Sequence, residues 1–289
     1  MTILELFNEC WADHWDQSRF HDSGHAKEVK SKFKLHIEKT FGDKEYLSVT
    51  RAQVRDWHKS LRETPTVGNR CMEILSKLYR FSIDKEWNSG AYNPCFGIKH
   101  FTEKKRRRFA SENEIGRIGV ILNRELSKKP LEITFILTLF FTGARPRSLE
   151  RARWDEFTEL DGGFGLLTFF GKSTAETGDE ESLILPPNIV TMMKVLPKRD
   201  DGFIFGIKAP SYLWRKIRAE AGCRDLWLRD SRRSFATVGM GSGVKMDTIG
   251  KLLNHHSNQT TMRYALLNRA ASVEAVTVIS DKLKYILKK

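Results

Sequence analysis

Residues 228–237 are Leu228-Arg229-Asp230-Ser231-Arg232-Arg233-Ser234-Phe235-Ala236-Thr237, which puts three arginines at the predicted start of a helix. Upstream, Thr142-Gly143-Ala144-Arg145-Pro146-Arg147 places arginines after a predicted helix stop, because glycine favours a helix end and proline a helix start. Downstream, Leu252-Leu253-Asn254-His255-His256-Ser257 precedes Thr260-Thr261-Met262-Arg263-Tyr264. These segments gather cations, histidines and one tyrosine in the C-terminal part of the chain.

The order and spacing of the segments resemble the tyrosine recombinase family, which includes the phage integrases and the Xer-type recombinases. The family signature is an arginine after a Thr-Gly turn, a His-x-x-Arg box, a Leu-Gly-His segment and a nucleophilic tyrosine. Here Tyr264 follows His255 by nine residues and His255 follows Arg232 by twenty-three, spacings similar to those of the family. Each segment alone is a weak signal, and their joint order makes the resemblance specific.

The resemblance implies a catalytic role for each matching position. Arg145 and Arg232 match the two arginines of the signature, and Tyr264 matches the nucleophile. His255 matches the second histidine, and Lys172, at the start of a predicted hairpin loop, matches the hairpin lysine. With the residue at the first-histidine position included, the implied set is Arg145, Lys172, Arg229, Arg232, His255 and Tyr264.

Three positions depart from the family pattern. Arg229 replaces the first histidine, Ser148 stands where an acid usually follows the first arginine, and Asn254 replaces the glycine of Leu-Gly-His. Arginine donates hydrogen bonds to phosphate but cannot exchange a proton near neutral pH. We therefore expect Arg229 to contact phosphate or DNA, or else to form a salt bridge with nearby acids.

The chemistry of DNA strand exchange explains these residue types. Two guanidiniums, here Arg145 and Arg232, can stabilise the charge that develops on the phosphate oxygens during phosphodiester cleavage. A tyrosine hydroxyl has a pKa of about 10, so Tyr264 would need a partner such as His255 to attack. Lys172 could protonate the leaving 5′ oxygen, because neighbouring cations lower the pKa of a lysine.

The composition of the chain favours a folded protein with a polyanionic partner. Its 289 residues are 40% hydrophobic and carry a net charge of +13, which favours nucleic acid. No basic amphipathic anchor, apolar span or export signal is visible. The four cysteines are scattered without a CxxC pair, so the sequence predicts neither a disulfide framework nor a zinc site. This cysteine usage favours a cytoplasmic location.

The first part of the chain, residues 1–103, is predicted to be a small helical domain. Val29, Phe33, Ile37 and Phe41 recur at helical spacing, Thr50 is placed to cap a second helix, and a further stripe runs through residues 69–87. With a helix near residues 3–14, this makes four helices. The resemblance implies that this domain is the DNA core-binding domain of the family.

A basic linker, residues 104–108, separates this domain from a second one. Five consecutive cations are well placed to follow a phosphate backbone, and Ser111-Glu112-Asn113-Glu114 predicts a capping box that opens the next helix. A solvated linker without DNA contacts is the alternative. The predicted DNA contacts are Lys104, Lys105, Arg106, Arg107 and Arg108.

Residues 109–289 are predicted to form a mainly helical catalytic domain with one small antiparallel sheet. An apolar helix spans about residues 131–141, and residues 164–170 and 182–185 alternate as the strands of a hairpin would. Residues 271–287 carry an apolar stripe at helical spacing, suited to packing on a neighbouring protomer or on its own domain.

The resemblance implies a two-domain clamp that cuts and rejoins duplex DNA through a 3′-phosphotyrosine, without a metal or nucleotide cofactor. Family members act as four protomers on two duplexes. A DNA-binding protein of recombinase ancestry that no longer cleaves, and a type IB topoisomerase-like enzyme, remain alternatives. Because the helical pattern begins near Met1, the chain could be a simple recombinase or a fragment lacking an arm-binding domain.

Overall fold

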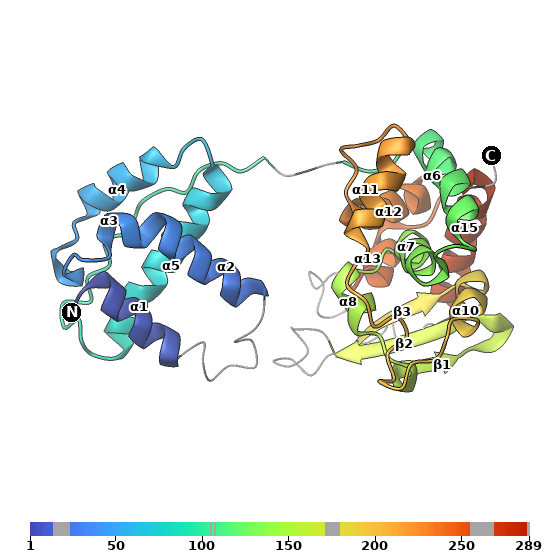
Figure 1. The fold of residues 1–289 in the computed structure, drawn as a ribbon, viewed down its shortest axis with the longest axis horizontal. Helices are drawn as coiled ribbons and strands as arrows, with labels where there is room; N and C mark the ends of the chain where they lie inside the picture. Colours follow the sequence, from blue (N-terminus) through green and yellow to red (C-terminus); the bar gives the residue numbers. More distant parts are fainter. Residues whose placement is uncertain (14–23, 105, 107, 171–179, 255–268, 288–289) are drawn as a thin grey trace. The chain divides into compact units, whose positions relative to one another are not determined.

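The computed structural model describes residues 1–13, 24–104, 106, 108–170, 180–254 and 269–287. The chain divides into two compact units, Met1–Arg106 and Arg107–Lys289 (Figure 1). Each unit has its own hydrophobic core. In the described residues, no helix is long and apolar enough to cross a membrane.

Unit 1 is helical, as predicted. The stripe of Val29, Phe33, Ile37 and Phe41 lies in the buried core, along a nearly continuous run of helix that includes one π-helical stretch. Thr50 forms a capping box with Gln53, which confirms the predicted N-cap. The helices are α1 (Ile3–Trp11), α2 (Gly24–Lys32), the π-helix (Phe33–Glu38), α3 (Lys39–Phe41), α4 (Arg51–Ser60) and α5 (Pro65–Asp84).

Unit 2 is built of helices and one sheet. Ser111 and Glu114 form the predicted capping box at the start of the first helix. The described helices are α6 (Glu112–Glu125), α7 (Pro130–Thr142), α8 (Pro146–Arg151), α10 (Pro187–Lys194), α11 (Ser211–Glu220), α12 (Ser231–Gly241), α13 (Met246–Leu252) and α15 (Arg269–Leu287).

The apolar helix α7 is the centre of unit 2. Every residue from Ile133 to Thr142 is buried. The helices α6, α10, α12 and α15 pack against it, together with one strand of the sheet. An element with no solvent-facing side is apolar all round, which explains why this segment lacks a polar face.

The sheet has three antiparallel strands in the order β1 (Phe157–Glu159), β2 (Gly165–Phe170) and β3 (Glu180–Leu185). The β2 and β3 pair is the predicted hairpin, with Phe169 opposite Glu181. The strand β1 was not predicted, because three residues are too few to show a pattern of alternation.

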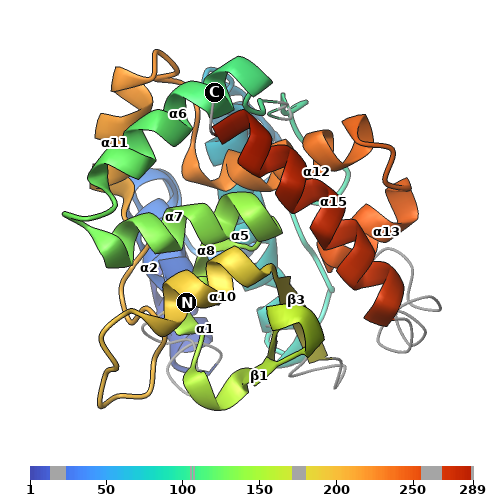
Figure 2. The same ribbon diagram turned by 90° about the vertical axis from the view of Figure 1, so that its right-hand side faces the viewer.

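The last described helix, α15, packs within its own unit. Figure 2 shows it lying beside α12 and α6, and it also contacts α13. The stripe residues Val276, Ile279, Leu283 and Leu287 are buried in the core of unit 2. Of the two predicted partners, the stripe therefore packs on its own domain, and these four side chains are not exposed for packing on a neighbouring protomer.

Candidate active site

The first arginine segment sits in a tight turn between α7 and α8. Gly143 ends α7 in the left-handed conformation, with φ of 66°. Thr142 fixes the same turn, because its Oγ1 donates to the carbonyl of Thr138 at 2.6 Å and accepts from the N–H of Ala144 at 3.2 Å. The chain then reverses, and Arg145 becomes the N-cap residue of α8.

Arg232, in the first turn of α12, joins two other helix ends. Its Nη1 donates to the carbonyl of Gly143 at 2.9 Å, and its Nη2 donates to the carbonyl of Leu253. These residues are the C-caps of α7 and α13. Carbonyls at helix C-termini carry partial negative charge, so a guanidinium is favoured there. Arg232 therefore holds the Thr-Gly turn and the end of α13 together.

A buried carboxylate, Glu181 of β3, adds negative charge to this cluster. Its Oε1 lies 3.2 Å from Nη1 of Arg145, and the residue is only 7% exposed. Burial, followed by the nearby charge of Arg145, lowers the pKa of Arg232 to about 10, and Glu181 opposes this shift. Two guanidiniums that repel each other and share one carboxylate favour an anion as a further partner.

Asn254, the departure from Leu-Gly-His, has a clear structural reason. It adopts the left-handed conformation, with φ of 50°, which glycine and asparagine tolerate best. Its Nδ2 also donates to the carbonyl of Ser182 at 2.8 Å, which attaches the end of α13 to β3. The asparagine therefore preserves the backbone that a glycine would supply and adds a hydrogen bond.

Arg229 is the exposed middle residue of a 3₁₀ turn, Leu228–Asp230, immediately before α12, and the other two residues of the turn are buried. Its guanidinium is 5.9 Å from the ring centroid of Trp227, a cation–π contact. The turn is held by the fully buried Asp230, which accepts from the N–H of Trp227 at 2.8 Å and from Arg233 at 3.1 Å. Asp230 therefore supports the turn that carries Arg229.

Three predicted catalytic residues, Lys172, His255 and Tyr264, lie outside the described residues. The structure brings Arg145 and Arg232 together through the Thr-Gly turn, and it adds Glu181, which the sequence analysis missed.

In the described residues, no cluster of three or more histidine, cysteine, aspartate or glutamate side chains could hold a metal ion.

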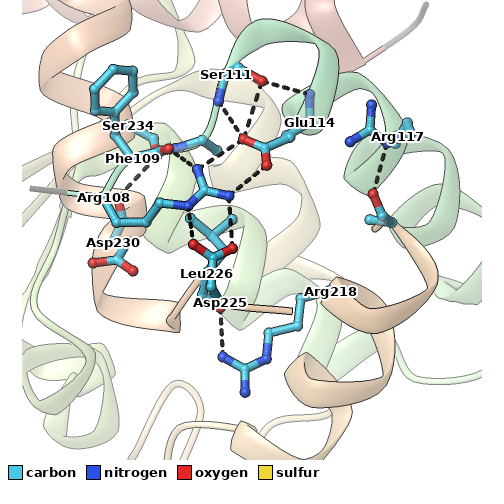
Figure 3. A network of polar contacts seen from close by, with 12 residues as sticks. Arg108, Phe109, Ser111, Glu114, Arg117, Arg218, Asp225, Leu226, Asp230 and Ser234 are labelled. Atoms are coloured by element: carbon cyan, nitrogen blue, oxygen red, sulfur yellow. Dashed lines mark hydrogen bonds and ion pairs between the residues drawn. The ribbon is translucent and has the colours of Figure 1, made fainter. Parts of the chain in front are cut away.

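Arg108, the last cation of the basic linker, is committed to a polar network inside unit 2 (Figure 3). Its Nη1 and Nη2 donate to the two carboxylate oxygens of Glu114 at 3.0 and 2.5 Å, and its Nε donates to Asp225 at 2.7 Å. With further bonds to Asp225 and to the carbonyl of Phe109, all five N–H donors are occupied. A phosphate contact at Arg108 would therefore have to replace an internal one.

The other linker cations differ from Arg108. Lys104 is exposed and Arg106 is half-buried, while Lys105 and Arg107 lie outside the described residues. Beyond the linker, the N–H of Ala110 donates to Ser234 Oγ at 2.8 Å. The chain therefore enters unit 2 fastened to the helix that carries Arg232.

The chain was compared with protein families, with curated proteins and with solved structures. No protein-family model matches the chain. No curated protein matches it either. Solved structures do match: lambda integrase as a dimer on core-site DNA has a TM-score of 0.64 at 15% identity, with 89% of this chain and 96% of that one covered.

Two further structures agree with this match. The Tn1549 transposon integrase bound to circular intermediate DNA has a TM-score of 0.63 at 11% identity, covering 91% of this chain and 95% of that one. The XerH site-specific recombinase in a post-cleavage complex has a TM-score of 0.61 at 16% identity, covering 85% and 78%. At these identities, the similarity concerns the fold.

Proposed function

We propose that this chain, which has the tyrosine recombinase fold, is a site-specific DNA recombinase that cuts and rejoins duplex DNA through a 3′-phosphotyrosine. The observation that carries the proposal is the pair of guanidiniums, Arg145 and Arg232: Arg145 follows the Thr-Gly turn and Arg232 bonds to the carbonyl of Gly143 in that turn. The repulsion between them is relieved when a phosphodiester lies beside both.

The two arginines would stabilise the transition state of phosphoryl transfer. Negative charge grows on the non-bridging oxygens during the attack, and preorganised charge-assisted donors act most strongly on that developing charge. Arg232 is preorganised by its two carbonyl acceptors, and Arg145 by its carboxylate partner. Removal of one such donor typically costs about 10²- to 10³-fold in rate.

The remaining roles rest on the resemblance and on general chemistry. Tyr264 would attack the phosphorus, with His255 accepting its proton or stabilising the anion that forms, and Lys172 would protonate the leaving 5′ oxygen. Arg229, which cannot exchange a proton near neutral pH, would donate hydrogen bonds to the DNA backbone. The phosphotyrosine retains the bond energy, so rejoining needs no nucleotide cofactor.

The proposed partner is duplex DNA, bound by both units, with four protomers on two duplexes. The net charge of +13 supports a polyanionic partner. A lambda integrase tetramer bound to a Holliday junction has the same fold, with a TM-score of 0.64. Unit 1 would act as the core-binding domain and unit 2 as the catalytic domain.

The test is covalent trapping on a selected site. Duplexes that bind the protein are first enriched from a random pool, and the enriched site is then rebuilt as a nicked suicide substrate. We expect the wild-type chain to form an adduct that survives a denaturing gel, and Tyr264→Phe to bind the same DNA without forming it. A full-strength adduct in Tyr264→Phe would remove Tyr264 from this role.

Absence of any wild-type adduct, with DNA binding intact, would favour the non-cleaving alternative, for which Arg229 and Ser148 are the motivating residues. Product analysis separates the remaining alternative. Exchanged duplexes would support a recombinase, whereas relaxed topoisomers alone would indicate a topoisomerase-like enzyme.

A further inference from the structure

The ion pair between Glu181 and Arg145 joins two parts of the chain that the sequence keeps apart. Arg145 follows the Thr-Gly turn, whereas Glu181 lies near the start of β3, thirty-six residues later. The carboxylate is buried and the guanidinium is about half exposed, with side-chain exposures of 9% and 44%. A buried carboxylate paired with a partly exposed arginine fixes the position of the guanidinium at the end of that side chain.

We infer that Glu181 is a positioning residue for Arg145, holding its guanidinium in the orientation that binds the scissile phosphate. This inference rests on the proposed recombinase function. Glu181 bonds to Nη1 of Arg145, and a guanidinium has five N–H donors, so other donors remain for a phosphate. The pairing therefore orients Arg145 without consuming its capacity to bind an anion.

The sequence context supports this role. Position 148, three residues after Arg145, holds a serine. The N–H of Ser148 donates to the carbonyl of Arg145 at 2.9 Å, which closes the first turn of α8. A carboxylate at that position would be a helical neighbour of Arg145, because residues three apart share a face. Glu181 supplies negative charge to the same guanidinium from the sheet.

The position of Glu181 also links the arginine to the rest of the site. The next residue, Ser182, accepts the hydrogen bond from Asn254, so adjacent positions of β3 hold the Arg145 turn and the end of α13. Glu181 additionally provides a counter-charge to Arg232, whose pKa it acts to raise. Loss of this one carboxylate would loosen Arg145 and leave two guanidiniums with less compensation.

The first experiment measures the ion pair without requiring DNA. Phenylglyoxal, which modifies guanidiniums, is applied to the full chain, and labelling of Arg145 is followed by peptide mass spectrometry. Glu181→Gln keeps the side-chain shape and removes the charge, so we expect labelling of Arg145 to rise several-fold. The matched control is Glu159→Gln, because Glu159 lies in the same sheet and its ion pair is with Lys194, at 2.5 Å. An unchanged labelling rate in Glu181→Gln would overturn the inference.

The second experiment measures cleavage of the selected suicide substrate at saturating DNA, so that binding losses are not mistaken for chemical ones. Glu181→Gln should cleave about 10- to 100-fold more slowly, a smaller loss than removal of an arginine donor, because Arg145 remains but is less well oriented. Its dissociation constant for DNA should change little, and Glu181→Asp, which keeps the charge, should cleave faster than Glu181→Gln.

Two results would contradict positioning. Faster cleavage by Glu181→Gln would mean that the carboxylate masks Arg145 from the phosphate. An unchanged cleavage rate despite increased labelling would mean that the ion pair does not matter for catalysis. Failure of the proposed function itself is distinguishable, since the wild-type chain would then form no adduct while the labelling experiment still decides whether Glu181 holds Arg145.

Discussion

Replacement of Gly143 by alanine should disturb the turn on which the arginine pair is built. Gly143 has φ of 66°, and an added Cβ would lie 2.5 Å from Leu253 Cδ2 and 2.9 Å from Phe235 Cδ1. The carbonyl of Gly143 also accepts the hydrogen bond from Arg232 Nη1. Both neighbouring side chains are buried, so relief of the overlap moves them or the helix ends that carry them, and Arg232 is bonded to the end of α13 at Leu253.

The magnitude follows from two contributions. An L-residue in the left-handed region costs about 1–2 kcal/mol. Forcing a methyl group into a packed site costs about 1–3 kcal/mol more, because the neighbours must leave their preferred positions. Gly143→Ala should therefore lose about 2–5 kcal/mol of unfolding free energy.

The matched control is Gly222→Ala. Gly222 has a similar φ of 71°, but no described atom lies within 4 Å of its added Cβ, so this variant carries the backbone cost alone. Thermal melting compares the two variants, since 1 kcal/mol shifts the Tm of a domain the size of unit 2 by about 2–4 °C. Gly143→Ala should melt at least about 2 °C below Gly222→Ala.

Peptide-resolved hydrogen exchange then locates the effect, because thermal melting alone does not separate unit 2 from unit 1. We expect faster exchange at the C-terminal ends of α7 and α13 in Gly143→Ala, and unchanged exchange there in Gly222→Ala. Equal Tm values for the two variants, with equal exchange at these helix ends, would refute the argument that steric contact, and not φ alone, requires glycine at position 143.

Three other predictions concern the linker and the end of α13. Lys104→Ala should reduce the slope of log Kd for DNA against log salt concentration by about one, and Arg108→Ala should leave this slope unchanged, as binding titrations at several salt concentrations would measure. Arg108→Ala should instead lower the Tm in thermal melting. Arg108, together with Ser111, holds the pKa of Glu114 below its ordinary value of 4.5, so stability from Glu114 is present above that pH and is lost as pH falls through the folded value. Acid titration of Arg108→Ala should show a smaller loss, because the hydrogen bonds from Ser111 remain. Urea unfolding should rank wild type above Asn254→Gly, which loses about 1 kcal/mol, and above Asn254→Ala, which also loses the left-handed preference.

Local signals in the sequence were sufficient for much of the fold. The N-cap at Thr50, the capping box at Ser111 and the stop at Gly143 depend on neighbours within a few residues, and all three were predicted. The helical stripes and the β2–β3 hairpin likewise depend on periodicity. The helix predicted over residues 69–87 begins at Pro65, because boundaries depend on end contacts that periodicity does not report.

Contacts between distant residues could not be predicted in this way. Arg108 was grouped with four other cations, and the contact that distinguishes it, Asp225, is 117 residues away. The apolar stripe of α15 was compatible with two partners, because a stripe reports that a face is buried but not against what. Only the packing of α15 on α6 and α12 resolves the choice.

The departures from the family pattern illustrate the same limit within the candidate site. Read alone, Ser148 and Asn254 suggest that two of the boxes have decayed. In the structure, Asn254 keeps the left-handed backbone and bonds to Ser182, and the neighbouring Glu181 pairs with Arg145. Both departures are thus matched by contacts at the start of β3, a segment that belongs to neither box. For the third departure, Arg229, the contact found among the described residues is the cation–π contact with Trp227, so cleavage assays that vary position 229 bear most directly on activity.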